Sequence, residues 1–269
     1  MNRIVPAEAE VYQHFDADLT REVPAEAMGG WTRVSVDLAL GKTAVVSMHA
    51  WENPPPAEYP GCYRCREYLP RATQILDTVF APLLTDIRKA GFPLFHVVEP
   101  VLFGRAEKAG KTYAPPADPP GQAAWTEADP YYQAMRNLRK KTAFVGERNW
   151  PDVTRSFPIV DFHAASRPQG KEPILRDTSQ LETLCKERKI VHLVYIGFAI
   201  NVCLFHMPCG IWSMAPKGYV CSAIREATTA VENRETARKE LNKEAALWQI
   251  GLETGFVFGE KAFRKAILR

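Results

Sequence analysis

The chain has 269 residues, of which 46% are hydrophobic and 24% are charged. These proportions are near those of average globular proteins, so we expect one large domain that buries a sizeable core. The 34 Lys and Arg residues nearly balance the 31 Asp and Glu residues and are scattered among them. This pattern argues against nucleic acid as a partner.

The sequence contains no apolar run near the roughly 20 residues that a membrane-spanning helix needs, and its start lacks the apolar core of a secretion signal. We therefore expect a cytoplasmic protein with no membrane partner. Six cysteines are too few for a disulfide framework in a chain of this size, and a reducing compartment would keep them as thiols. Cys62 and Cys65 have metal or redox spacing, but no second Cys or His pair accompanies them.

The first half of the chain predicts an arm followed by a strand, a helix and a strand. Residues 1–40 show no sustained periodicity and are expected to form an N-terminal arm, with residues 41–269 as the domain. The β-branched run 42–49 predicts a buried strand. Apolar positions at helical spacing over 69–90 predict an amphipathic helix, and 92–99 predicts a second strand. Parallel strands joined in this way form a right-handed crossover.

Residues 100–156 are rich in Pro, Gly, Lys and aromatic residues, which predicts an inserted region that serves as a lid, an interface or a disordered segment. Strands and helices then alternate to the end of the chain. This alternation predicts an α/β protein with a mainly parallel sheet covered on both faces. The predicted elements are helix 178–188, strand 190–196, an apolar helix after Cys203, strand 218–224, helix 233–251 and strand 255–258.

Cys203 follows a strand that ends at Gly197, and a short turn places it in the first turn of the predicted helix. Partial positive charge at a helix N-terminus lowers a thiol pKa, and the unpaired backbone N–H groups there can receive an oxyanion. Ligands of open α/β sheets collect at the C-terminal ends of strands, where this turn must lie. The alternative is that Cys203 is a small buried apolar residue.

Four stretches of the chain resemble the isochorismatase-like cysteine hydrolases, a family that includes nicotinamidases, carbamoylsarcosine hydrolases and ureidoacrylate hydrolases. The most specific stretch is Gly197 through Cys203. The resemblance implies a doubly wound, three-layer α/β/α fold with a mostly parallel six-stranded sheet. The matching stretches are 42–53, 70–99, 178–203 and 218–230, the last containing Arg225-Glu226-Ala227-Thr228 where the family has an Asp-Ala pair.

The resemblance also implies a chemistry. Cys203 would be the nucleophile, assisted in the family by an Asp and a Lys, and its thiolate would attack an amide-like carbonyl. The backbone of Ala199 and Ile200, joined by a cis peptide bond, would help to form the oxyanion hole. Ile200 stands where the family often has Thr. The resemblance implies a small-molecule substrate, no cofactor and a homo-oligomer, with residues 100–156 suited to the interface.

Two family positions carry different residues here. His49 occupies the Asp position, although a slip of the alignment would place Ser47 there. Histidine can act as a base toward a thiol, with an unperturbed pKa near 6.5. The cation position falls on Arg176 or, alternatively, on Lys171. Arginine would fix charge without shuttling protons.

Other residues offer weaker candidates. His206 lies three residues after Cys203 on roughly the same helical face, and a packing or surface role is its alternative. Asp161 and His163 have the spacing of the nicotinamidase metal pair at a different position, so no metal is expected. The sequence therefore leaves open a cysteine hydrolase acting on a small amide, imide or related carbonyl compound and a noncatalytic binding or assembly module. A redox pair of Cys203 with Cys209 is a third hypothesis.

Overall fold

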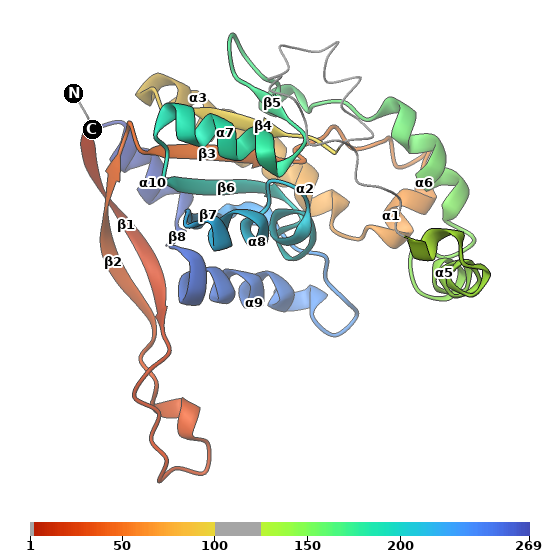
Figure 1. The fold of residues 1–269 in the computed structure, drawn as a ribbon, viewed down its shortest axis with the longest axis horizontal. Helices are drawn as coiled ribbons and strands as arrows, with labels where there is room; N and C mark the ends of the chain where they lie inside the picture. Colours follow the sequence, from red (N-terminus) through yellow and green to blue (C-terminus); the bar gives the residue numbers. More distant parts are fainter. Residues whose placement is uncertain (1–2, 100–124) are drawn as a thin grey trace.

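The structure is a computed structural model that describes residues 3–99 and 125–269. The first part of the predicted insertion, residues 100–124, lies outside this range. The described strands form one sheet in the order β2-β1-β8-β7-β6-β3-β4-β5 (Figure 1). The strands are β1 Ile4–Gln13, β2 Gly30–Ala39, β3 Thr43–Met48, β4 Leu94–Val97, β5 Ile174–Leu175, β6 His192–Phe198, β7 Val220–Thr229 and β8 Val257–Phe258.

Six of these strands, β3 to β8, pair in parallel. From β3 the chain crosses to β4 and β5 on one side, and it then returns to β6, β7 and β8 on the other side. This is the doubly wound, mostly parallel arrangement predicted from the sequence. The sheet has eight strands instead of six because residues 4–39 add two antiparallel strands, β1 and β2, beyond β8.

Helices cover both faces of the sheet (Figure 1). Side chains alternate between the two faces along each strand, so that Val45 packs into one hydrophobic cluster with α2, α3 and α10, while Val46 packs into the other with α7, α8 and α9. The three-layer prediction is thus confirmed. The helices are α1 Pro60–Cys65, α2 Leu69–Ile75, α3 Ala81–Ala90, α5 Pro130–Thr142, α6 Trp150–Ser156, α7 Thr178–Arg188, α8 Ile211–Met214, α9 Leu241–Gln249 and α10 Glu260–Ile267.

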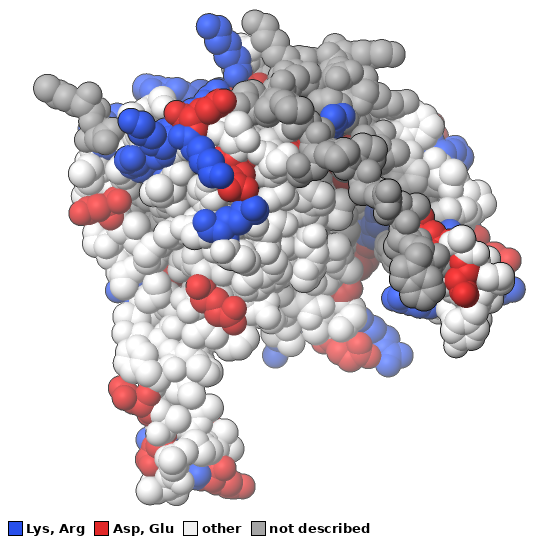
Figure 2. Space-filling model, in the orientation of Figure 1, with Lys and Arg blue, Asp and Glu red and all other residues white. Residues whose placement is uncertain are grey.

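The surface agrees with the mixed charge of the sequence. Figure 2 shows Lys and Arg side chains interspersed with Asp and Glu side chains on the face that it presents. Within residues 3–99 and 125–269, none of the helices combines the length and the apolar character that crossing a lipid bilayer requires.

Residues 1–40 differ from the expected arm because most of them form a β-hairpin. The two strands β1 and β2 pair from Ile4↔Ala39 to Gln13↔Gly30, but β1 pairs with β8 only through Ala9 and Glu10. The hairpin also packs on the domain through Val5 and Leu38, which lie in the core, and through Tyr12, which contacts Trp248 of α9. Only the segment that joins its two strands projects from the domain (Figure 1). Exposed and buried side chains alternate only in the first six residues of β1, Ile4 to Ala9. This alternating segment is too short to predict the whole strand from the sequence.

The last long helix is shorter than predicted. It begins at Leu241 rather than at 233, because the Asn233 side chain accepts hydrogen bonds from the backbone N–H groups of Glu235 and Thr236 and so closes a turn. Glu240 then has a left-handed backbone, with φ +49°. Asparagine favours turns through this kind of side-chain bond to its own backbone.

The helix predicted after Cys203 is broken. Ile200–Leu204 form a five-residue π-helical turn, and the four-residue helix α8 follows after an irregular segment in which Cys209 has φ +67°. Cys203 therefore lies in a short turn and not at the start of a long helix.

Strands β3 and β6 approach each other closely at Gly197. In the parallel register Gly197 lies opposite Met48, and a Cβ atom at Gly197 would lie only 1.9 Å from the Met48 carbonyl oxygen. Its φ of +122° also belongs to the region that favours glycine. The residues that follow each strand, His49 and the turn holding Cys203, are thereby brought to the same edge of the sheet.

We expect Gly197→Ala to lower the free energy of unfolding by about 2–4 kcal/mol, because it adds a steric clash to an unfavourable backbone conformation. Urea unfolding measures this change. The matched control is Gly218→Ala, where φ is +91° but no atom lies within 4 Å of the added Cβ, so only the conformational cost of about 1–2 kcal/mol remains. Equal losses in the two variants would show that the approach to Met48 contributes nothing.

Candidate functional site

A cavity of about 540 Å³ lies at the carboxyl ends of β3, β4 and β6. Because β3 and β6 are the neighbouring strands at which the chain reverses its direction across the sheet, this is the switch point at which open α/β sheets bind ligands. Apolar side chains make up much of its wall. The polar and charged groups facing it include those of His49, Glu52, Asn53, Arg66, Tyr68, Glu99 and Cys203.

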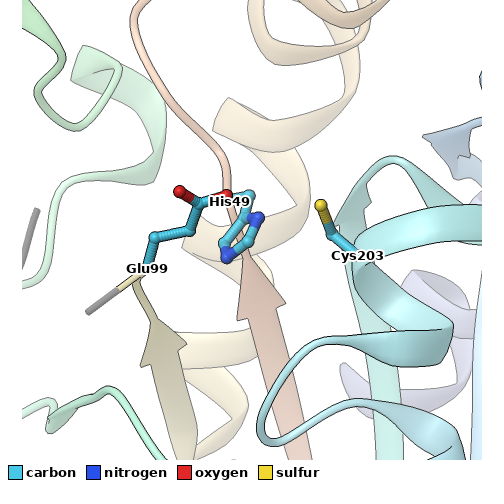
Figure 3. A group of neighbouring side chains, drawn as sticks. All are labelled: His49, Glu99 and Cys203. Carbon is cyan, nitrogen blue, oxygen red and sulfur yellow. The ribbon is translucent and has the colours of Figure 1, made fainter. Parts of the chain in front are cut away.

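Three chemically active side chains converge in this cavity. A ring nitrogen of His49, a carboxylate oxygen of Glu99 and the Cys203 sulfur all lie within 4.8 Å of one another. His49 follows β3, Glu99 follows β4, and Cys203 belongs to the turn after β6. Figure 3 shows the His49 ring between the other two side chains. The structure thus brings the predicted pair His49 and Cys203 together, and it adds a carboxylate.

His49 is held by its backbone and by ring stacking. Its backbone N–H donates to the Val97 carbonyl at 3.2 Å, and its φ is +54°. Its ring stacks on the Trp51 ring with 5.7 Å between centroids. The side chain is only 6% exposed, and burial lowers the His49 pKa to about 4. The imidazole is therefore neutral at pH 7. Ser47, the alternative from the sequence, is buried within β3.

The Cys203 thiol does not have the lowered pKa that the sequence predicts. Burial raises its pKa to about 11, and the Glu99 charge adds to the rise, whereas a backbone hydrogen bond from Ala199 and the charge of Arg66 act in the opposite direction. A five-residue turn provides little of the dipole that a long helix would supply. Cys203 is therefore a thiol at neutral pH.

Sequence reasoning missed Glu99 and Arg66. Burial raises the Glu99 pKa, and the charge of Arg66 partly opposes this rise. A signal for Glu99 was present, since it ends the predicted strand 92–99, which pairs in parallel beside 42–49 with Met48 opposite Val97. No sequence pattern indicated Arg66. It caps the short helix α1, and the tertiary packing of that helix places it at the cavity.

The two predicted cations lie elsewhere. Arg176 directly follows the edge strand β5, and its Nε lies 3.8 Å from an Asp177 carboxylate oxygen. Lys171 is exposed in the turn before β5. Neither is among the described residues that line the cavity. Arg66 is the cation that the described structure brings to the thiol.

The oxyanion segment differs from its prediction by one residue. The cis peptide bond joins Phe198 to Ala199, not Ala199 to Ile200. Ala199 lines the cavity, while the Ile200 side chain is fully buried in the core. The turn is fastened by Asn201, whose side chain accepts from the Val231 N–H and donates to the Val231 carbonyl, both at 2.9 Å.

The remaining candidates have other surroundings. His206 is exposed and lines a separate cavity. The buried Cys209 thiol donates to the Asp177 carbonyl at 2.9 Å, which indicates a structural role.

The Asp-x-His pair is engaged with other protein groups. Asp161 pairs with Arg167 at 2.8 Å, and a His163 ring nitrogen lies 3.3 Å from an Asp77 carboxylate oxygen. Among the described residues, the group with metal-ligand geometry is the cluster of His49, Glu99 and Cys203.

No protein-family model matches the sequence, and no curated protein matches it. Solved structures that resemble this chain include isochorismatase-family proteins and cysteine hydrolases. A cysteine hydrolase from Pseudomonas syringae pv. phaseolicola is 17% identical, covering 86% of this chain and 94% of its own, with a TM-score of 0.49. An isochorismatase family protein from Burkholderia thailandensis is 14% identical, covering 85% and 97%, with a TM-score of 0.46. N-carbamoylsarcosine amidase from Thermoplasma acidophilum is 13% identical, covering 81% and 96%, with a TM-score of 0.43.

We expect alkylation of Cys203 by iodoacetamide to be slow at pH 7 and to accelerate about tenfold per pH unit up to about pH 10, because only the thiolate reacts. At pH 7 the folded protein should react on the order of a hundredfold more slowly than the urea-unfolded chain, in which the thiol has its ordinary pKa. Mass spectrometry of the peptide containing Cys203 separates it from the other cysteines. Rapid labelling at pH 7 would instead mean that the resting site holds a thiolate.

Proposed function

We propose that this protein is a divergent isochorismatase-like cysteine hydrolase that acts on a small amide, imide or related carbonyl compound. One observation carries the proposal: a thiol, an imidazole and a carboxylate converge in a cavity at the switch point of the sheet. A nucleophile, a base and a group that supports the base are the parts that acyl transfer requires. The resemblance of Gly197 through Cys203 to the family's nucleophile turn supports the same assignment.

Cys203 is the nucleophile in this proposal, and His49 is the base. As the sulfur bonds to the substrate carbonyl carbon, the thiol proton passes to the neutral imidazole, and the Glu99 carboxylate stabilises the imidazolium that forms. Backbone N–H groups of Ala199 and Ile200 hold the oxyanion. The imidazolium returns its proton to the leaving amine, and water then releases the acyl group from the sulfur. The resting pair is neutral, so charge separates only when substrate is attacked.

Arg66 is the cation of the proposed site, in place of Arg176 or Lys171. It stays charged throughout the ordinary pH range, so it fixes charge near the thiol and does not carry protons. A cavity of about 540 Å³ is of the size that holds small molecules, about 300–1,000 Å³. The apolar wall around these few polar groups favours a substrate that joins a carbonyl group to an apolar body.

A screen of amides, ureas and N-acyl compounds tests this function. Cys203→Ala should abolish turnover, and His49→Ala should lower kcat by about 10²–10⁴-fold, the usual contribution of a general base. His206→Ala is the matched control, because His206 is exposed and lines a different cavity. Turnover that persists in Cys203→Ala would contradict the proposal.

The cation is assigned by a second comparison on the same substrate. Arg66→Ala should impair turnover, whereas Arg176→Ala and Lys171→Ala should not. The opposite result would return the cation to the position that the family resemblance implies.

A noncatalytic binding module is the second candidate. The observation that favours it is that Cys203 and His49 are both neutral at rest, with pKa values of about 11 and about 4. These values disfavour the thiolate–imidazolium pair. In that case compounds from the same screen would raise the melting temperature of the protein and would not be hydrolysed. The six free cysteines fit a reducing cytoplasm under either function.

We also propose that the protein is a homo-oligomer whose contact includes the β1–β2 hairpin. The segment that joins its strands exposes Phe15, Leu19 and Val23, which are 56%, 86% and 48% exposed, and the end of the hairpin stands away from the domain (Figure 1). Apolar side chains displayed in this way are suited to a contact with another chain.

Size-exclusion chromatography with light scattering should find an oligomer at micromolar concentration. Changing Phe15, Leu19 and Val23 together to Ser should dissociate it while leaving the unfolding transition of the domain in place. A wild-type monomer would refute the proposal.

A further inference from the structure

We propose that His49, Glu99 and Cys203 form a binding site for a zinc-like divalent cation. The three side chains offer one nitrogen, one oxygen and one sulfur atom, and these atoms lie within 4.8 Å of one another. Zinc takes these ligand types, and its catalytic sites commonly use three protein ligands with the fourth position open. Here the open position would face the cavity that all three residues line.

The surroundings of His49 point independently to a ligand. The side chain is only 6% exposed, its ring lines the cavity, and it lies beside the other two groups (Figure 3). A ring nitrogen that opens onto a cavity is available to a ligand held there. The neutral imidazole is the form that binds a metal ion, and one of its nitrogens lies within 4.8 Å of both the sulfur and a carboxylate oxygen.

The identity of the ion follows from the ligands and their charge. A thiolate selects zinc or another borderline or soft ion over Mg²⁺ or Ca²⁺, which prefer oxygen. One thiolate and one carboxylate together carry two negative charges, which neutralise a divalent ion in a buried site. Their attraction for the ion offsets its repulsion by the positive charge of Arg66. The ligands come from the ends of β3, β4 and β6, so the sheet fixes their spacing.

Binding exchanges a proton for the metal at sulfur. The S–H bond of Cys203 breaks, the proton passes to solvent, and a metal–sulfur bond forms without any change of oxidation state. The ion thereby withdraws the thiol from nucleophilic attack and the imidazole from its role as base. Bound metal and hydrolysis by Cys203 are therefore mutually exclusive, although metal binding itself does not depend on the proposed hydrolase activity.

Titration of the metal-free protein with Zn²⁺, followed by competition with a chromophoric chelator, tests the site. We expect one ion per chain. Cys203→Ala, His49→Ala and Glu99→Gln should each weaken binding at least about tenfold, since loss of even an outer partner of a metal ligand costs about 10–100-fold. His206→Ala should bind as the wild type does. Zn²⁺ binding that all three variants retain, or no saturable binding, would overturn the proposal.

Co²⁺ gives a second readout, whose main part is measured on the wild type. A thiolate-to-cobalt charge-transfer band should appear in the wild type, disappear on addition of Zn²⁺ and be absent from Cys203→Ala. Zn²⁺ should also protect Cys203 from alkylation at high pH. Zinc binding with no protection would mean that the ion lies elsewhere. Hydrolysis by the metal-free protein is measured separately, so either proposal can fail while the other stands.

Discussion

The close approach of β3 and β6 at Gly197 is the constraint on which the site depends. No side chain fits between Gly197 and the Met48 carbonyl. With glycine at this position, β3 and β6 stay paired as far as Met48 and Gly197. His49 follows one strand, and the Cys203 turn follows the other. The doubly wound order makes these central strands neighbours, and β4 beside them adds Glu99. The chemistry is thus built by strand register, which packing on both faces holds in place.

Burial then decides the protonation of the site. Desolvation moves the Cys203 pKa up to about 11 and the His49 pKa down to about 4, and both shifts favour neutral forms at pH 7. The apolar surroundings of the cavity therefore suppress the charge that would make the thiol reactive. The Ala199 N–H and Arg66 favour the thiolate, but they do not outweigh burial in the resting site. In either proposed reaction the bound substrate or ion would supply the remaining stabilisation.

The sequence predicted the fold better than the site. Continuous apolar runs such as 42–49 and 190–196 predicted parallel strands. A strand of a parallel sheet is buried on both faces, so its sequence is apolar throughout and does not alternate with polar residues. The β1–β2 hairpin escaped prediction because only part of β1 alternates between exposed and buried side chains, while the rest of it is uniformly half-buried. The convergence of Cys203 and His49 was predictable, because both follow the ends of neighbouring parallel strands. Arg66 was not predictable. It caps the six-residue helix α1, and only the tertiary packing of that helix brings it to the cavity, which no local sequence pattern indicates.

His49 stands where the family resemblance implies an Asp, and the structure supplies a carboxylate from another strand. Glu99 brings a carboxylate to the same thiol from the neighbouring strand, and Arg66 brings a cation from α1. The ionic types that the family resemblance implies are therefore all present around Cys203, with an imidazole added between the thiol and the acid. The imidazole has a part in both of the proposed chemistries. It can accept a proton from sulfur, or it can share a metal ion with it, and the proton and the metal ion compete for the same sulfur electron pair.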